Sequence, residues 1–406
     1  MNLICDPGMY GAANVVERWC GSDPLRNAYP GAVAAVAKDG EIILKQVAGA
    51  GRIGSTESDP ASPLSVCAGA PMQWDSLFDV ASLTKPVATT MAALMLMEQG
   101  ELSGDDTLDL FFPQLRTVPL GQARVWNLLT HTAGFAESTV LFMAGAPDED
   151  PVTVIGRAPL AWAPGSHVQY SCAGFIILGR LIQVTTGYPL DRFVNESVFE
   201  PLEMRDTSYL PLSAPLPDRV RGRLIPTEPR STAERGRDLM AVHGIAKRWS
   251  EEEWFSRHLA GDIACGVVHD ENAAWLGGVS GNAGVFSTAE DLLKFGQMWL
   301  DGGVYNGRPI LSHATVRMAR RSQTAGLGDD DRGLGWQLPS RDTSFGDFAP
   351  LSCFGHTGFT GTGLWIDPEN GLVIVLLTNR LQFTRSNEQI GRVRRLFLNA
   401  VFSAVR

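Results

Sequence analysis

Val80-Ala81-Ser82-Leu83-Thr84-Lys85-Pro86-Val87 is followed by an apolar segment at residues 91–97, and together they predict the helix around which the chain is organised. The segment is apolar on nearly all sides, which is typical of a buried helix, and Gly100 ends it. At the start of this helix, Ser82 is expected at the N-cap, with Lys85 three positions later on the same face. A buried amine has a lowered pKa and can take the proton of a nearby hydroxyl. Ser82 and Lys85 are therefore a candidate nucleophile and base.

The composition bounds the class of protein. The 406 residues are 44% hydrophobic and 19% charged, which is typical of a globular protein with one large or two medium domains. A net charge of -10 argues against a nucleic-acid partner or an anionic membrane surface, because either would need clustered lysine and arginine. A small molecule or a peptide is the expected substrate.

Other sequence features indicate location and cofactor use. No apolar run approaches the roughly 18 to 20 residues that span a bilayer, and the N-terminus lacks the basic and apolar regions of a signal peptide. We therefore expect a cytoplasmic protein. Six cysteines without C-x-x-C spacing indicate reduced thiols. His269-Asp270-Glu271 has ligand-type side chains but no second histidine at a helical spacing, so we expect no metal and no cofactor.

Both ends of the chain show strand patterns, whereas the middle favours helices and loops. Strands are predicted at residues 31–37, 41–47, 335–338, 362–367 and 372–377. Helices are predicted at residues 10–19, 173–186 and 289–300, the last opened by the capping box Ser287-Thr288-Ala289-Glu290, and near the C-terminus, where Ile390, Val393, Leu396, Phe397 and Val401 share one face. We predict an α/β plus all-α fold: residues 1–80 and 285–406 form an antiparallel β-sheet domain flanked by helices, and residues 81–284 an inserted, mainly helical domain.

Residues 211–260 are expected to be an insertion that shapes a pocket. The first part is rich in proline and arginine, and the second is charged yet contains Trp249, Trp254 and Phe255. These aromatic residues are candidates for a pocket wall, and packing onto the body of the protein is the alternative.

Two further segments supply candidate partners for Ser82. Tyr170 lies just before the helix predicted at residues 173–186. Residues 354–362 form a glycine-rich approach to a strand and contain His356-Thr357-Gly358. His131 is expected to serve its loop, with the ring hydrogen-bonded to the backbone.

The order and spacing of these motifs resemble a known superfamily. S-x-x-K at Ser82, a Y-x-N-like motif at Tyr170 and a K/H-T-G motif at His356 are similar to those of serine β-lactamases, penicillin-binding proteins and family VIII carboxylesterases, above all the class C-like branch. Residues 128–134 and 281–288 resemble two further blocks of these serine hydrolases. The resemblance covers residues 28–402 and implies a β-lactamase/transpeptidase-like fold.

The resemblance implies a role for each matched position. Ser82 would be acylated, Lys85 would relay its proton, and Tyr170 would act as general base and then as acid. The phenol needs cationic neighbours for this, which we expect to be Lys85 and a protonated His356. Backbone N–H groups of Ser82 and Phe359 would form the oxyanion hole. The remaining matched positions would contact substrate: His356, Thr357, Gly358 and Cys172.

Two departures from the family pattern bear on the substrate. Cys172 stands where Y-x-N has asparagine, and cysteine lacks the amide that holds a peptide or lactam side chain. His356 stands where lysine is found, so its positive charge depends on protonation. Both favour a carboxylesterase that hydrolyses small esters through a Ser82 acyl-enzyme. An acyltransferase, a β-lactamase or D,D-peptidase, and a non-catalytic acylation sensor are the alternatives. Nothing in the sequence indicates the oligomeric state.

Overall fold

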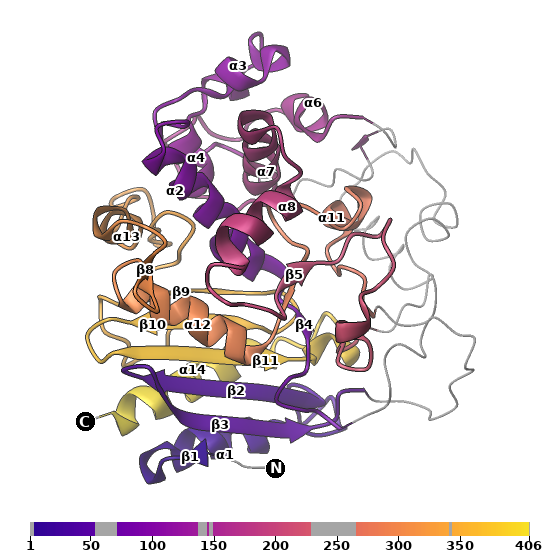
Figure 1. The fold of residues 1–406 in the computed structure, drawn as a ribbon, viewed down its shortest axis with the longest axis vertical. Helices are drawn as coiled ribbons and strands as arrows, with labels where there is room; N and C mark the ends of the chain where they lie inside the picture. The colour runs from indigo at the N-terminus through magenta and orange to yellow at the C-terminus, as the bar shows by residue number, and fades with distance from the viewer. Residues whose placement is uncertain are drawn as a thin grey trace.

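A computed structural model describes residues 4–52, 71–136, 144–145, 149–228, 265–340 and 343–405. Its main layer is a six-stranded antiparallel sheet with the order β1-β3-β2-β11-β10-β9. The strands are β1 (Ile4–Cys5), β2 (Gly31–Lys38), β3 (Glu41–Gly49), β9 (Phe354–Thr357), β10 (Gly363–Asp367) and β11 (Leu372–Thr378). Because β2 pairs with β11, strands from both ends of the chain share one sheet, as predicted (Figure 1).

The central strand β2 is buried on both faces. Its odd-numbered residues from Val33 to Ala37 belong to the same core as α12 (Ala289–Leu300). Its even-numbered residues from Ala32 to Val36 belong to a second core with α1 (Tyr10–Arg18) and α14 (Gln389–Ala404). Successive side chains of a strand point to opposite faces, so the apolar sequence of β2 accounts for helices on both sides of the sheet.

Helices from the middle of the chain lie above the sheet in Figure 1. α2 (Met91–Glu98) is buried along residues 91–96, and it contacts α7 (Cys172–Thr186). Ser171 is the N-cap of α7, and its hydroxyl accepts the Ala173 N–H. Tyr170 therefore lies directly before the N-terminus of α7. The shorter helices are α3 (Leu108–Phe111), α4 (Val125–Leu129), α6 (Pro151–Gly156), α8 (Leu190–Val194), α11 (Glu271–Trp275) and α13 (His313–Ala319).

A small sheet leads into the candidate nucleophile. It has the order β4-β6-β5, with β4 (Phe78–Asp79), β6 (Val285–Ser287) and β5 (Ser208–Tyr209). A separate hairpin joins β7 (Val304–Tyr305) to β8 (Arg308–Pro309). Because β4 ends at Asp79, its pairing with β6 sets where the Ser82 segment begins.

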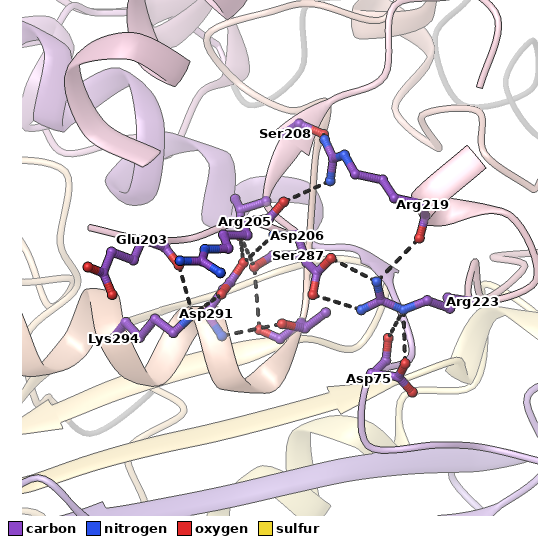
Figure 2. Close-up of polar contacts among 12 residues, drawn as sticks. Asp75, Glu203, Arg205, Asp206, Ser208, Arg219, Arg223, Ser287, Asp291 and Lys294 are labelled. Atoms are coloured by element: carbon purple, nitrogen blue, oxygen red, sulfur yellow. Dashed lines mark hydrogen bonds and ion pairs between the residues drawn. The ribbon is translucent and has the colours of Figure 1, made fainter. Parts of the chain in front are cut away.

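A cluster of polar side chains connects α12 to the segment that follows α8 (Figure 2). Arg223 donates to both carboxylate oxygens of Asp206, at 2.7 and 2.8 Å. The buried carboxylate of Asp291, on α12, accepts the Asp206 N–H and the Lys294 ammonium, each at 2.8 Å. We call Asp206, Arg223, Asp291 and Lys294 the α12 polar cluster.

Several local predictions are wrong. Residues 335–338 form no strand, because Gly335 turns the chain with φ of +71° and Gln337 makes only isolated bridges. The N-cap of α12 is Thr288, whose hydroxyl accepts the Asp291 N–H at 3.3 Å, so the predicted box is displaced by one residue. Cys265 takes part in a disulfide, whereas the thiols of Cys5, Cys20, Cys172 and Cys353 are free, as expected.

Other predictions lie beyond what the structure tests. Trp249, Trp254 and Phe255 fall outside the described residues, and the division into a sheet domain and an inserted helical domain stays a prediction. Within the described ranges, no helix combines the length and the apolar character needed to cross a membrane.

Candidate active site

Ser82 lies in a tight turn directly after β4. Residues Ala81–Leu83 form one turn of 3-10 helix, Lys85–Thr90 form a π-helix, and α2 follows. Ser82 therefore lies inside a turn, and the prediction that it caps an α-helix is wrong. A hydrogen bond from the end of β4 stabilises the turn: the carboxylate of Asp79 accepts the N–H of Ala81 at 2.8 Å.

Lys85 is fully buried beside Ser82. Its ammonium donates to Ser82 Oγ and to the Asn282 carbonyl, each at 3.0 Å, and lies 3.6 Å from Cys172 Sγ. Burial alone lowers the pKa of Lys85, but the neighbouring Cys172 and Tyr170 outweigh it, and the net pKa is raised. The charged form is thus favoured, which contradicts the neutral amine predicted from the Ser82–Lys85 spacing and agrees with the cationic Lys85 that the family resemblance implies. Lys85 can orient the Ser82 hydroxyl, but another group must accept the proton that Ser82 releases.

The Tyr170 ring lies among cations and histidine rings. Lys85 Nζ lies 5.0 Å from its centroid, and the guanidinium carbon of Arg332 lies 5.3 Å from it. The ring centroids of His131 and His356 lie 4.5 and 5.9 Å from that of Tyr170. The structure therefore brings the S-x-x-K, tyrosine and H-T-G segments together, although they are far apart in the chain.

Both of these histidines are buried and neutral. His131 Nδ1 accepts a backbone N–H at 3.1 Å, which is the loop role predicted for it. His356 Nδ1 lies 2.9 Å from the Thr357 carbonyl, and this bond assigns its proton to Nδ1. Burial, together with the charges of Arg332 and Lys85, lowers the pKa of each ring well below its usual range. The expectation of a protonated His356 is therefore wrong.

Residues 358–362, which contain the predicted oxyanion-hole donor Phe359 and which we call the oxyanion segment, pack against the Ser82 turn. The Thr360 hydroxyl donates to the Asp79 carbonyl at 2.8 Å, and the Thr362 hydroxyl donates to the Val80 carbonyl at 3.0 Å. A Cβ at Gly358 would lie 2.1 Å from Thr362 Oγ1 and 2.5 Å from the Val80 oxygen. Only glycine allows this approach, which holds the segment beside the turn.

A cavity of about 290 Å³ opens beside Ser82. Its described lining residues are Ser82, Tyr170, Arg332, Gln337, His356, Thr357, Gly358, Phe359, Arg380 and Arg394. Six of them were predicted from the sequence, and Gln337 and the three arginines were not. Cys172 is not among the described lining residues. Burial raises the pKa of its thiol although Lys85 opposes the shift.

The three arginines are buried. Arg332 contacts the Asp330 carboxylate through Nε at 2.9 Å. Arg380 Nε donates to the Phe359 carbonyl at 2.8 Å, and Arg394 donates to the carbonyls of Gly358 and Thr362, each at 2.8 Å. Burial lowers the pKa of Arg380 to about 10 and that of Arg394 to about 9.

One sequence signal could have revealed Arg394. It lies between Val393 and Phe397 on the apolar face of α14, and a charged residue on a buried face needs a partner there. Arg332 and Arg380 come from irregular or 3-10 segments and have no comparable signal.

Comparison with known proteins decides the family. A family model described as Beta-lactamase matches residues 16–399. The chain belongs to the beta-lactamase family. It is 32% identical over 384 residues to a protein of Escherichia coli O157:H7 named "Putative D-alanyl-D-alanine carboxypeptidase", covering 90% of this chain and 82% of that protein.

Solved structures share the fold of this family member. A family VIII carboxylesterase covers 100% of both chains, with a TM-score of 0.68 and 18% identity. A hydrolase with promiscuous acyltransferase activity covers 97% of this chain and 98% of its own, with a TM-score of 0.65 and 20% identity. The predicted family and fold are confirmed, and the protein is a serine hydrolase of the β-lactamase fold.

Proposed function

We propose that this protein hydrolyses a substrate whose leaving group carries a carboxylate, through an acyl-enzyme on Ser82. The observation that carries the proposal is the cavity itself: its described lining includes Arg332, Arg380 and Arg394 together with Ser82, and no carboxylate side chain. A guanidinium matches the planar geometry of a carboxylate and is always charged near neutral pH.

In the proposed reaction Tyr170 takes the proton of Ser82, because both residues line the cavity and Lys85 lies beside both of them. Ser82 Oγ would attack the substrate carbonyl carbon while its proton passes to Tyr170 as the general base, whose ring lies near the cations Lys85 and Arg332. The tetrahedral oxyanion would accept hydrogen bonds from the backbone N–H groups of Ser82 and Phe359. When the bond to the leaving group breaks, Tyr170 returns the proton to it. A water molecule then repeats the sequence on the ester and frees Ser82.

A peptide ending in D-alanyl-D-alanine is the first candidate substrate. Its scissile bond lies next to a terminal carboxylate, and the E. coli O157:H7 relative is named for this activity. The sequence favoured esters partly because the positive charge of His356 would depend on its protonation. Arg332 is charged without any such condition, and it can bind a substrate carboxylate with the part of its guanidinium that Asp330 does not occupy, which restores peptides to the first place.

Hydrolysis of small esters is the second candidate. Cys172 leaves the site without the amide of the Y-x-N motif, and the half-exposed ring of Phe359 offers an apolar edge to a short acyl group. Transfer of the acyl group to an amine or alcohol would use the same intermediate and differ only in the acceptor. A sensor would form the intermediate and fail to release it.

Three substrates separate these candidates: an acylated D-alanyl-D-alanine peptide, its C-terminal amide, and p-nitrophenyl acetate. Ser82→Ala should abolish turnover of all of them. Arg332→Gln should lower kcat/KM about 10- to 100-fold for the peptide with a free C-terminal carboxylate, as expected for loss of a hydrogen bond between charged groups. The other two substrates should change less than about threefold. Arg308→Gln, at an exposed arginine of β8, is the matched control.

The outcomes distinguish the proposals. If Arg332→Gln lowers kcat/KM equally for peptide and amide, Arg332 does not bind the carboxylate. If only the ester is turned over, the carboxylesterase proposal replaces the first one. Product analysis with an added amine tests transfer.

A further inference from the structure

A buried carboxylate lies directly before the turn that carries Ser82. Asp79 is 2% exposed, and both of its carboxylate oxygens accept backbone N–H groups. Oδ1 accepts the N–H of Ala81 at 2.8 Å, and Oδ2 accepts that of His269 at 2.6 Å. Burial raises the pKa of Asp79, and these two bonds oppose the rise. Burying a carboxylate is costly, so its position needs a reason.

The residue that Asp79 binds is in a strained conformation. Ala81 has φ of +48°, in the left-handed region, which costs a residue with a Cβ about 1 to 2 kcal/mol. Its N–H points to Asp79 Oδ1, a side-chain turn that stabilises this backbone. Ser82 follows immediately, so the conformation of Ala81 sets the direction of the Ser82 hydroxyl and N–H.

The opposite side of the oxyanion hole is attached to the same strand end. Thr360 and Thr362, in the oxyanion segment, donate their hydroxyls to the carbonyls of Asp79 and Val80. The His269 ring, whose residue is tied to Asp79 Oδ2, lies 5.7 Å from that of Phe359. Contacts to both N–H donors of the proposed oxyanion hole therefore converge on Asp79 and its neighbour.

We propose that Asp79 is a positioning residue, whose carboxylate keeps Ala81 left-handed and so aligns the hydroxyl and N–H of Ser82 with the N–H of Phe359. Its carboxylate binds the backbone N–H groups of Ala81 and His269, so in this role it acts through the backbone and not by contact with substrate. The inference rests on the acyl-transfer function proposed above.

Asp79→Asn tests this role, because the amide accepts one N–H and presents its own donor to the other. We expect kcat to fall at least about tenfold, since small misplacements of reacting groups are costly, with KM within about twofold. Asp291→Asn, in the α12 polar cluster, is the matched control: it removes an equally buried carboxylate and should lower stability with kcat unchanged.

The second mutation relieves the strain itself. Glycine adopts positive φ freely, so Ala81→Gly should restore kcat about fivefold or more in the Asp79→Asn protein and change it less than about twofold alone. Such coupling is not expected if Asp79 only stabilises the fold. If Asp79→Asn does not fold, Ala81→Val strains the same turn with Asp79 in place and should lower kcat at least about tenfold.

The controls separate failure of the inference from failure of the function. A fluorophosphonate probe should label wild-type protein at Ser82, and Ser82→Ala should be inactive; otherwise the acyl-transfer function is wrong. If both hold and the kcat of Asp79→Asn stays within twofold of wild type, or Ala81→Gly raises kcat equally in both backgrounds, the inference is overturned. Unchanged kcat in a folded Ala81→Val protein overturns it too.

Discussion

Replacing Gly358 with alanine should displace the oxyanion segment from the Ser82 turn. The new Cβ would lie 2.1 Å from Thr362 Oγ1 and 2.5 Å from the Val80 oxygen, whereas 3.0 Å is the closest that Cβ contacts come. Neither neighbour yields easily, because the Val80 oxygen is backbone and the Thr362 hydroxyl is bonded to it. The segment must therefore move by about 1 Å, and a misplacement of that size costs about 100-fold in rate. This corresponds to about 3 kcal/mol of transition-state stabilisation.

The measurement is kcat, KM and melting temperature with the substrate that wild-type protein cleaves best. Overpacking at Gly358 should also cost about 1 to 3 kcal/mol of stability, which a folded domain of this size tolerates. Gly391→Ala is the matched control, because a Cβ there meets nothing within 4 Å and alanine favours the helix α14. It should keep full activity. A kcat of Gly358→Ala within about threefold of wild type would refute the reasoning.

Three further predictions concern neighbouring side chains. Lys85→Met removes the ammonium that orients Ser82 and should slow acylation about 1,000-fold, measured by quenched-flow mass spectrometry of the acyl-enzyme. His356 stays neutral in the folded protein but takes a proton in the unfolded chain below about pH 6.5, so the free energy of unfolding falls as pH drops from 7 to 5. Urea melts at these pH values should show a smaller fall for His356→Gln than for wild type. Cys172→Asn places an amide beside Lys85 and should raise kcat/KM for the acylated peptide relative to p-nitrophenyl acetate about tenfold, and an unchanged ratio would argue against peptide side-chain recognition there.

The regular elements were predictable where local pattern and tertiary environment agree. The continuous apolar sequence of β2 is what a strand between two cores requires, and the apolar run of α2 is what a fully buried helix requires. Residues 335–338 failed for a physical reason. Trp336 is buried, as in a strand, but Gly335 turns the backbone and prevents a ladder.

Only those residues of the site that belong to sequence motifs were predictable. They identified Ser82, Tyr170 and His356, which line one cavity. They could not give the charge of His356, which depends on its burial and on Arg332, a residue from another segment. Likewise, the raised pKa of Lys85 depends on which side chains face it, and this is a property of the folded state.

The pairing of β2 with β11 has a consequence for how the protein matures. Val36 lies opposite Ile374, so the centre of the sheet closes only after residues 372–378 have left the ribosome. Until then, β2 exposes an apolar edge that can pair with another nascent chain. Such distant pairing also slows folding. Holdase chaperones that cover residues 31–38 during synthesis should therefore raise the yield of native enzyme.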